Sequence, residues 1–524
     1  MKLAKTAVLA ALLSSTWLMP AMAQDLTIGR ASEQSSIDPQ FSRTGNNQMT
    51  SAMFFDRLVD FGPNLEMTPG LAESWEVENP TTWVLHLRDG VTFHDGSAFT
   101  ADDVIFSLER ADEVPNSPAP YTDMVSAVAS MEKVDDLTLK ITTNAPAPTL
   151  MQDIGRVFII SNAASDGKAS EDFNSPATAV GTGPYILEEW KPGETLTMKA
   201  NDAYWADVPE FKDVEIRYIS NDAARVAALL SGAVDVIDAV PPQDVPRVDG
   251  TDGLHVFSAA SGRVIYFGLS MRFDQAPGVT DLDGNPLSEN PFKDVRVRKA
   301  VSLMIDRKLI VDRILGGSGV PAGQLAGEAL GGHNPDVKPD EVDVAKAKEL
   351  LTEAGYPNGF GITVYSSNDR FPGDGDLAQA LGQMLARGGL KVNGVEALPY
   401  SVYSKAASAG DYGAFVFSLG ASTPNSAPLL QALLHTYDKD RGMGAFNRVR
   451  FSDPAYDAAL EEALQEFDPE VLDAKLQDLT TMVFAEQPIV PLYWQKVHWG
   501  LKDGLNINEG LSEQTLPQNV SSAE

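Results

Sequence analysis

The alternation of hydrophobic and polar residues is clearest within residues 65–110. Every second residue of 83–87 is Trp or Leu, which predicts a strand with one buried face. The Asp89-Gly90 pair that follows favours a tight hairpin turn. A returning strand is expected to begin at Val91.

A helix is predicted directly after this turn. Thr100 is a good N-cap, and Asp103 can reach back to it in a variant of the capping box. Apolar residues that recur every three or four positions indicate further helices over residues 221–231 and from Asp294 onward. Strand patterns such as residues 234–237 separate the helices, and this mixture indicates an α/β fold.

Residues 1–23 have the features of a secretory signal sequence. Lys2 and Lys5 precede an apolar run over residues 7–18, and Ala23 ends a small-x-small cleavage site. The run is shorter than the roughly 20 residues that cross a bilayer. We therefore expect cleavage after Ala23 and export of the remaining chain.

The chain of 524 residues contains no cysteine. Disulfides, thiolate metal sites, cysteine nucleophiles and a lipid-modified cysteine are therefore excluded. An exported protein of this kind is expected to be free in the periplasm and not a lipoprotein, and its hydrophobic core alone must stabilise it.

Acidic residues outnumber basic residues by 73 to 40, which gives a net charge of −33. Such a surface repels phosphates and anionic membranes, so no nucleic-acid partner is expected. The acidity favours solubility and does not identify a ligand. At ~150 residues per domain, the length indicates about three domains.

No catalytic or metal-binding motif is evident. The six histidines include no i, i+4 pair for zinc, and no Gly-x-Ser-x-Gly elbow is present. The glycine-rich residues 316–323 lack the spacing and the lysine of phosphate-binding loops and are interpreted as a turn. We expect no enzyme activity, no cofactor and no metal site, with a secreted α/β hydrolase as the alternative.

Some residues suit a small-molecule cleft. Arg370 follows a predicted strand and precedes a predicted helix, where α/β folds place ligand-binding groups. Its guanidinium can bind a carboxylate with two hydrogen bonds, and the alternative is an ion pair with Asp369 or Asp374. Aromatic residues near loops are candidates for the cleft walls, with ordinary core packing as the alternative. They are Tyr121, Phe371 and Tyr400.

Several sequence blocks, in the same order, resemble those of the family 5 solute-binding proteins, the peptide-binding receptors of ABC importers. The strongest is the region around Leu71-Ala-Glu-Ser-Trp75. Together the blocks extend over almost the whole chain after the signal sequence. They are residues 36–40, 65–110, 180–186, 201–205, 291–301, 447–457 and 487–492.

The resemblance implies an α/β, two-lobed periplasmic binding protein-like fold of the class II, large peptide-binding type. Three domains would surround a ligand cleft. Domain I would be discontinuous, domain II would be inserted into it, and domain III would form the opposing lobe. The expected boundaries are 24–64, 180–262 and 488–524 for domain I, 65–179 for domain II and 263–487 for domain III.

The resemblance also implies which residues bind the ligand. Arg370 matches the family's carboxylate-binding arginine, and Ser42 and Arg43 lie in a matching ligand-contacting loop. Ser422 falls where peptide binders have an amine-binding aspartate, and Thr423 is a second hydrogen-bond donor beside it. A serine does not neutralise a buried ammonium, which argues against a peptide with a free amino terminus.

The implied function is that of the periplasmic substrate-binding component of an ABC importer. A monomer would capture a small peptide or peptide-like solute by lobe closure. It would deliver the solute to an inner-membrane permease powered by cytoplasmic ATPase subunits. A blocked peptide, an amino-acid derivative, an opine-like compound, an oligosaccharide and a chelated metal remain alternatives for the ligand.

Overall fold

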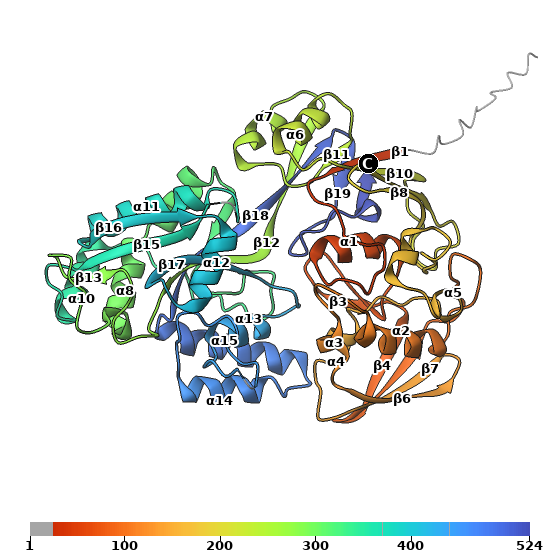
Figure 1. Cartoon of the computed structure of the whole chain (residues 1–524), viewed down its shortest axis with the longest axis horizontal. Coiled ribbons are helices and arrows are strands. Elements are labelled where there is room, and N and C mark those ends of the chain that lie inside the picture. Colours follow the sequence, from red (N-terminus) through yellow and green to blue (C-terminus); the bar gives the residue numbers. More distant parts are fainter. Residues whose placement is uncertain (1–24, 369, 440, 524) are drawn as a thin grey trace, which may run out of the picture.

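The computed structural model describes residues 25–368, 370–439 and 441–523. The predicted signal sequence and its cleavage site after Ala23 lie outside these residues. Two lobes lie side by side in Figure 1. Two long strands, β12 (Leu254–Leu269) and β18 (Ile489–Lys502), run between the lobes.

The antiparallel pairing of β12 and β18 joins the lobes. The first part of β12, up to Ala260, pairs with residues 496–502 in one lobe, and the part from Val264 pairs with residues 489–494 in the other. From the pair Ala260–Lys496 to the pair Val264–Trp494, β12 moves on by four residues and β18 by only two, so the register of the pairing shifts. A bulge of this kind bends a ladder. The predicted domain boundary after residue 262 falls here, and the domain division itself stays a prediction.

The first lobe continues the sheet away from β18. Leu26 and Ile28 of its N-terminal strand are buried in the core of this lobe, together with Trp499 of β18. In sheet order the strands are β11 (Val236–Ile237), β1 (Asp25–Arg30), β10 (Asp213–Tyr218), β9 (Thr195–Ala200) and β8 (Tyr185–Lys191). The helices and the C-terminal elements are α1 (Gly45–Phe54), α6 (Asp222–Leu230), η2 (Pro242–Asp244), α7 (Val245–Asp249), β19 (Leu505–Ile507), η5 (Pro517–Asn519) and β20 (Val520–Ser522).

A separate four-stranded sheet lies below this layer in Figure 1. Its second strand buries Trp83, Leu85 and Leu87, as the alternating pattern predicts. The sheet order is β4 (Ala72–Asn79), β5 (Thr82–Leu87), β7 (Thr138–Thr143) and β6 (Val128–Asp135). The neighbouring elements are β2 (Val59–Phe61), β3 (Met67–Pro69), α2 (Ala101–Glu113), α3 (Thr122–Val125), α4 (Leu150–Ile154), α5 (Asn162–Ser165) and η1 (Ser170–Asn174).

Two local predictions for this region have different outcomes. The capping box is confirmed, because the Asp103 carboxylate accepts a hydrogen bond from the Thr100 amide at 2.9 Å. The returning strand from Val91 is wrong: β5 pairs with β4 and β7 instead, although Gly90 has the positive φ of a turn. Both edges of β5 are already occupied, so no third partner can pair with it.

The second lobe packs helices on both faces of its part of the sheet. Ile265 and Phe267 of β12 face one core, and Val264 and Tyr266 face the other. The strands are β13 (Val279–Thr280), β14 (Gly319–Pro321), β15 (Gly361–Ser367), β16 (Lys391–Leu398) and β17 (Ala414–Gly420). The helices are η3 (Pro291–Lys293), α8 (Val295–Met304), α9 (Arg307–Leu309), η4 (Ile310–Ile314), α10 (Val344–Glu353), α11 (Asp374–Gly388), α12 (Tyr400–Ala409), α13 (Ala427–Leu434), α14 (Pro454–Ala463) and α15 (Pro469–Ala485).

A buried carboxylate fixes the segment that follows α1. Asp56 accepts hydrogen bonds from the Thr182 hydroxyl at 2.8 Å, the Trp205 indole at 2.7 Å and the Tyr204 hydroxyl at 3.1 Å. Burial raises the pKa of Asp56 to about 6, and the hydrogen bonds oppose this shift. The network anchors the backbone that carries the neighbouring Arg57.

A second buried carboxylate orders the C-terminal loop. Glu509 accepts hydrogen bonds from Ser512 and Asn519, both at 2.8 Å. Burial raises the pKa of Glu509 to about 7. This loop leads into residues 512–515, which face the space between the lobes.

Replacing Asp56 with alanine should destabilise the first lobe by roughly 3 kcal/mol or more, because three buried donors lose their acceptor. Urea unfolding followed by tryptophan fluorescence measures the change. The exposed Asp252→Ala is the control and should leave the unfolding midpoint unchanged. Equal midpoints for the two variants would contradict the anchoring role.

Glu509 should make stability fall as the pH rises from about 4.5 to about 7. The folded chain holds this proton more tightly than the unfolded chain, so the free energy of unfolding decreases through that window. Glu509→Gln removes the titration. The difference in unfolding free energy between the native chain and this variant should therefore change by on the order of 2 kcal/mol between pH 5 and pH 7.5. A constant difference would disagree with the raised pKa.

Candidate functional site

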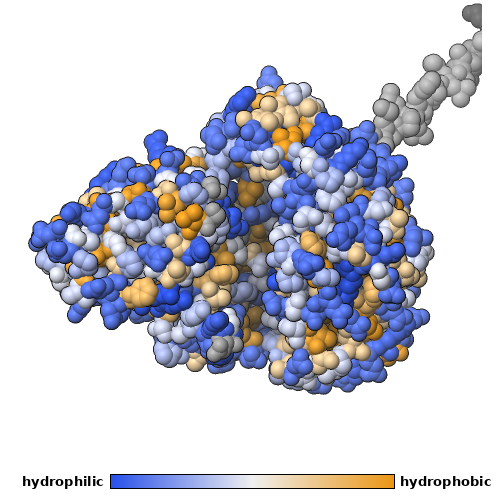
Figure 2. All heavy atoms as spheres, in the orientation of Figure 1, coloured by the Kyte–Doolittle hydropathy of each residue, from blue (hydrophilic) through white to orange (hydrophobic). Residues whose placement is uncertain are grey.

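A hollow separates the two lobes on the face shown in Figure 2. Three cavities, of about 650, 260 and 270 Å³, are each lined by residues on both sides of it. We call the first the Arg370 cavity and the second the Ser422 cavity, after residues that line them. The third contains Trp494 and Ala260, beside the bulge between β12 and β18.

The Arg370 cavity lies where β15 ends and α11 begins. The exposed Arg370 guanidinium packs over the ring of Tyr400, 5.2 Å from its centroid. Asp374, offered by the sequence as an ion-pair partner, instead accepts hydrogen bonds from the Arg370 amide at 3.0 Å and the Ser367 hydroxyl at 2.7 Å. The other predicted partner, Asp369, is outside the described residues. Phe371 lines the cavity and is otherwise buried in the core.

The Ser422 cavity brings the opposing lobe close to α1 and its following segment. Ser422 is exposed and lines the cavity together with Gln48, Arg57 and Arg156. The Thr423 hydroxyl donates to the Asn425 carbonyl at 2.9 Å, which holds the loop after β17.

The predicted residues of the first lobe lie beside this cavity and differ in exposure. Ser42 is buried, and its hydroxyl accepts from the Thr44 amide at 3.3 Å. Tyr121 is completely buried in the core around the four-stranded sheet. Arg43 is partly exposed and lies 3.4 Å from Asp123. In this arrangement Arg43 alone among these three presents its side chain to solvent.

Sequence reasoning missed Arg57 and Arg156. Arg57 pairs with Asp60 at 2.7 Å and packs over Phe61, and the Arg156 guanidinium lies over the same ring at 5.6 Å. Burial lowers the pKa of Arg156, and the positive charges of Arg57 and Arg43 lower it further. No spacing in the sequence links these arginines, because the fold alone brings residues 43, 57 and 156 together.

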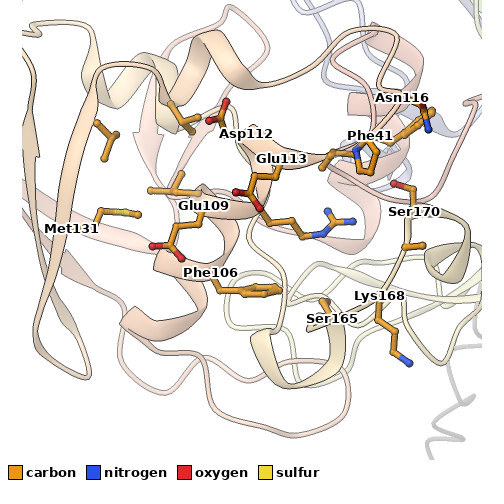
Figure 3. A pocket seen from close by; sticks show the side chains of 18 of the residues that line it. Phe41, Phe106, Glu109, Asp112, Glu113, Asn116, Met131, Ser165, Lys168 and Ser170 are labelled. Carbon is orange, nitrogen blue, oxygen red and sulfur yellow. The ribbon is translucent and has the colours of Figure 1, made fainter.

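A larger cavity, of about 820 Å³, lies away from the hollow, between α2, β6 and the segment around Lys168 (Figure 3). The guanidinium of Arg110 at its wall already binds Asp38 at 2.7 Å and Gln40 at 2.9 Å. The positive charge of Arg110 is therefore already paired with a carboxylate of the protein. We do not assign the candidate site to this cavity.

The described residues contain neither a cluster of metal-binding side chains nor a membrane-spanning helix. No group of three or more histidine, aspartate or glutamate residues in this part of the chain is arranged to hold a metal ion. Over the same residues, no helix is long and apolar enough to cross a membrane.

Comparison with known proteins identifies relatives of similar length. Heme-binding protein A of Haemophilus influenzae is 27% identical over 472 residues, which cover 84% of this chain and 82% of that protein. The glutathione-binding protein GsiB of Escherichia coli K12 is 26% identical over 483 residues, covering 91% and 90%.

Solved structures share the fold. HbpA2 from Haemophilus parasuis superposes with a TM-score of 0.82 at 24% identity, covering 96% of this chain and 100% of that one. The murein tripeptide-binding protein MppA, in an unliganded open form, gives 0.80 at 21%, covering 96% and 98%. DppA from Helicobacter pylori with the peptide STSA gives 0.72 at 23%, also covering 96% and 98%.

A family model also matches most of the chain. It describes the bacterial extracellular solute-binding proteins, family 5, and matches residues 66–441. The expected two-lobed α/β fold is confirmed by the structural matches. The chain belongs to the family 5 bacterial extracellular solute-binding proteins.

Proposed function

We propose that this substrate-binding component of an ABC importer captures a small peptide-like solute that carries a carboxylate. One observation carries the proposal: arginines from both lobes line the hollow of a protein whose net charge is −33. Lys496 and four carboxylates line the same two cavities, so individual guanidinium groups rather than a large net potential would attract anionic groups. The guanidinium fork also matches the two oxygens of a carboxylate.

Lobe closure supplies the capture mechanism. A solute that contacts both lobes only in the closed form stabilises that form by its differential affinity. The bulge between Ala260 and Val264 is where the shared ladder is most easily bent. The closed form would then be recognised by the inner-membrane permease, whose cytoplasmic ATPases power import.

The roles of individual residues follow the chemistry of the two cavities. Arg370 would hold a carboxylate, with Phe371 as apolar wall beside it. Ser422 and Thr423 would offer hydroxyls from the opposing lobe. Ser42 would support the loop of Arg43 rather than contact the solute, and the buried Tyr121 would offer only its hydroxyl, which has no hydrogen-bond partner of good geometry among the described residues. The ligands named for relatives, heme and glutathione among them, belong to those proteins, and an opine, an oligosaccharide or a chelated metal stay alternatives here.

The cellular setting is part of the proposal. The chain would be exported, cleaved after Ala23 and left free in the periplasm without a lipid anchor, since it contains no cysteine. It would act as a monomer, need no cofactor and release its solute chemically unaltered.

Arg370→Ala should weaken binding of the co-purifying solute, identified by mass spectrometry, by about ten- to a hundredfold, because a charge-assisted pair is lost. Isothermal titration calorimetry measures the affinity. Arg247→Ala removes an exposed arginine outside the three cavities and should bind as the native chain does. Unchanged affinity of Arg370→Ala would remove this residue from the site.

Solute binding should also compact the molecule. Small-angle X-ray scattering with and without the same solute should show a smaller radius of gyration in the complex, since closure brings the lobes together. An unchanged radius at saturation would refute capture by closure, and recovery of a modified solute would point to the hydrolase alternative.

A further inference from the structure

We propose that Arg43, Arg57 and Arg156 form a second anion subsite, which binds a carboxylate or phosphate group of the captured solute. We call these three residues the arginine cluster. The inference rests on the proposed function and narrows the substrate class to solutes with two anionic groups. One group would meet Arg57 and Arg156 in the Ser422 cavity, with Arg43 beside it, and the other would meet Arg370.

The three guanidinium groups lie close together. Arg57 and Arg156 pack over the same ring of Phe61, at 5.3 and 5.6 Å. Arg57 also lies 4.9 Å from the ring centroid of Phe158. Arg43 is near enough for its charge to act on Arg156. Aromatic rings hold the cations in place without neutralising them.

The nearby carboxylates compensate this charge only in part. Asp60 pairs with Arg57 at 2.7 Å and Asp123 with Arg43 at 3.4 Å, and their side chains are 66% and 80% exposed. Water screens the two exposed carboxylates, so they offset the charge of the more buried arginines only partly. Among the described residues, Arg156 has no ion pair within 4 Å, although the more distant charge of Asp153 attracts it.

Several donors of the cluster also lack acceptors. The Arg43 Nε and Arg156 Nη2 atoms are buried and make no hydrogen bond. The hydroxyl of the fully buried Tyr121 has no partner with good geometry either, although Gln48 lies near it. Buried donors without acceptors cost free energy. An anion with several oxygen acceptors would satisfy them and relieve the repulsion between the cations.

The two cavities are adjacent, which fits a solute with two anionic groups. Asn46, Met49 and Glu513 line both of them. Glu513 places a carboxylate between the arginine cluster and Arg370, where it would accept an N–H group of the solute. A solute that spans both cavities contacts both lobes, as closure requires.

Inorganic phosphate and succinate, titrated calorimetrically at low ionic strength, are the probes. We expect both to bind the native chain, Arg156→Gln to weaken each about tenfold or more, and Arg247→Gln to bind as the native chain does. Tyr121→Phe should also weaken binding, by severalfold. Absence of binding by the native chain, or equal binding by Arg156→Gln, would overturn the subsite.

The thermal midpoint separates a binding role from a structural one. Without added anion, Arg156→Gln should melt at nearly the same temperature as the native chain, because the repulsion from Arg43 and Arg57 that is removed offsets the lost attraction to Asp153. A lower midpoint would mean that Arg156 stabilises the fold, and would count against the proposal. Compaction by the co-purified solute with unchanged affinity in Arg156→Gln would leave the proposed function standing and refute the subsite alone.

Discussion

The antiparallel pairing of β12 with β18 holds the two lobes together in one molecule. Three hydrophobic clusters each lie within one lobe, and a fourth, around Val264, is mainly in the second lobe but includes Leu65 and Leu511 of the first. The register of the shared ladder shifts at two places, between Ile265 and Tyr266 and, with a longer interruption, between Ala260 and Val264. Bending there disturbs few hydrogen bonds, so the contacts of a small solute are large enough to shift the balance between open and closed forms.

The net charge of the whole protein and the charged groups that line the hollow act on a ligand over different distances. At long range the protein is strongly acidic, and this charge keeps it soluble. Salt screens such charge over about 8 Å at physiological ionic strength, so a ligand inside the hollow experiences mainly the groups that line it. Those groups include Arg57 and Arg156 on one wall and Arg370 on another. An acidic surface and an anion-binding cleft are therefore compatible.

Patterns within short stretches of sequence predicted individual helices and strands well, because the interactions that form these elements lie within the same stretches. The alternation around Leu85 and the reach of Asp103 to Thr100 each depend on residues within one element. The strand from Val91 failed because pairing depends on β4 and β7, which local sequence around the turn does not specify. Arg370 was found through its place between a strand and a helix. Arg57 and Arg156 were not, because only the packing of distant segments makes them neighbours.

Ser422 and the arginine cluster both favour a negatively charged ligand group over a positively charged one. By resemblance, Ser422 stands where an aspartate would attract an ammonium, and a serine provides no such charge. The same cavity contains Arg57 and Arg156, which would repel an ammonium. One wall has a serine in place of the family's aspartate, and the other has two arginines. Both features favour a negatively charged ligand group over a positively charged one. An ammonium in this cavity would meet two guanidinium groups and one carboxylate, that of Glu513, so an anionic group is the chemically consistent occupant.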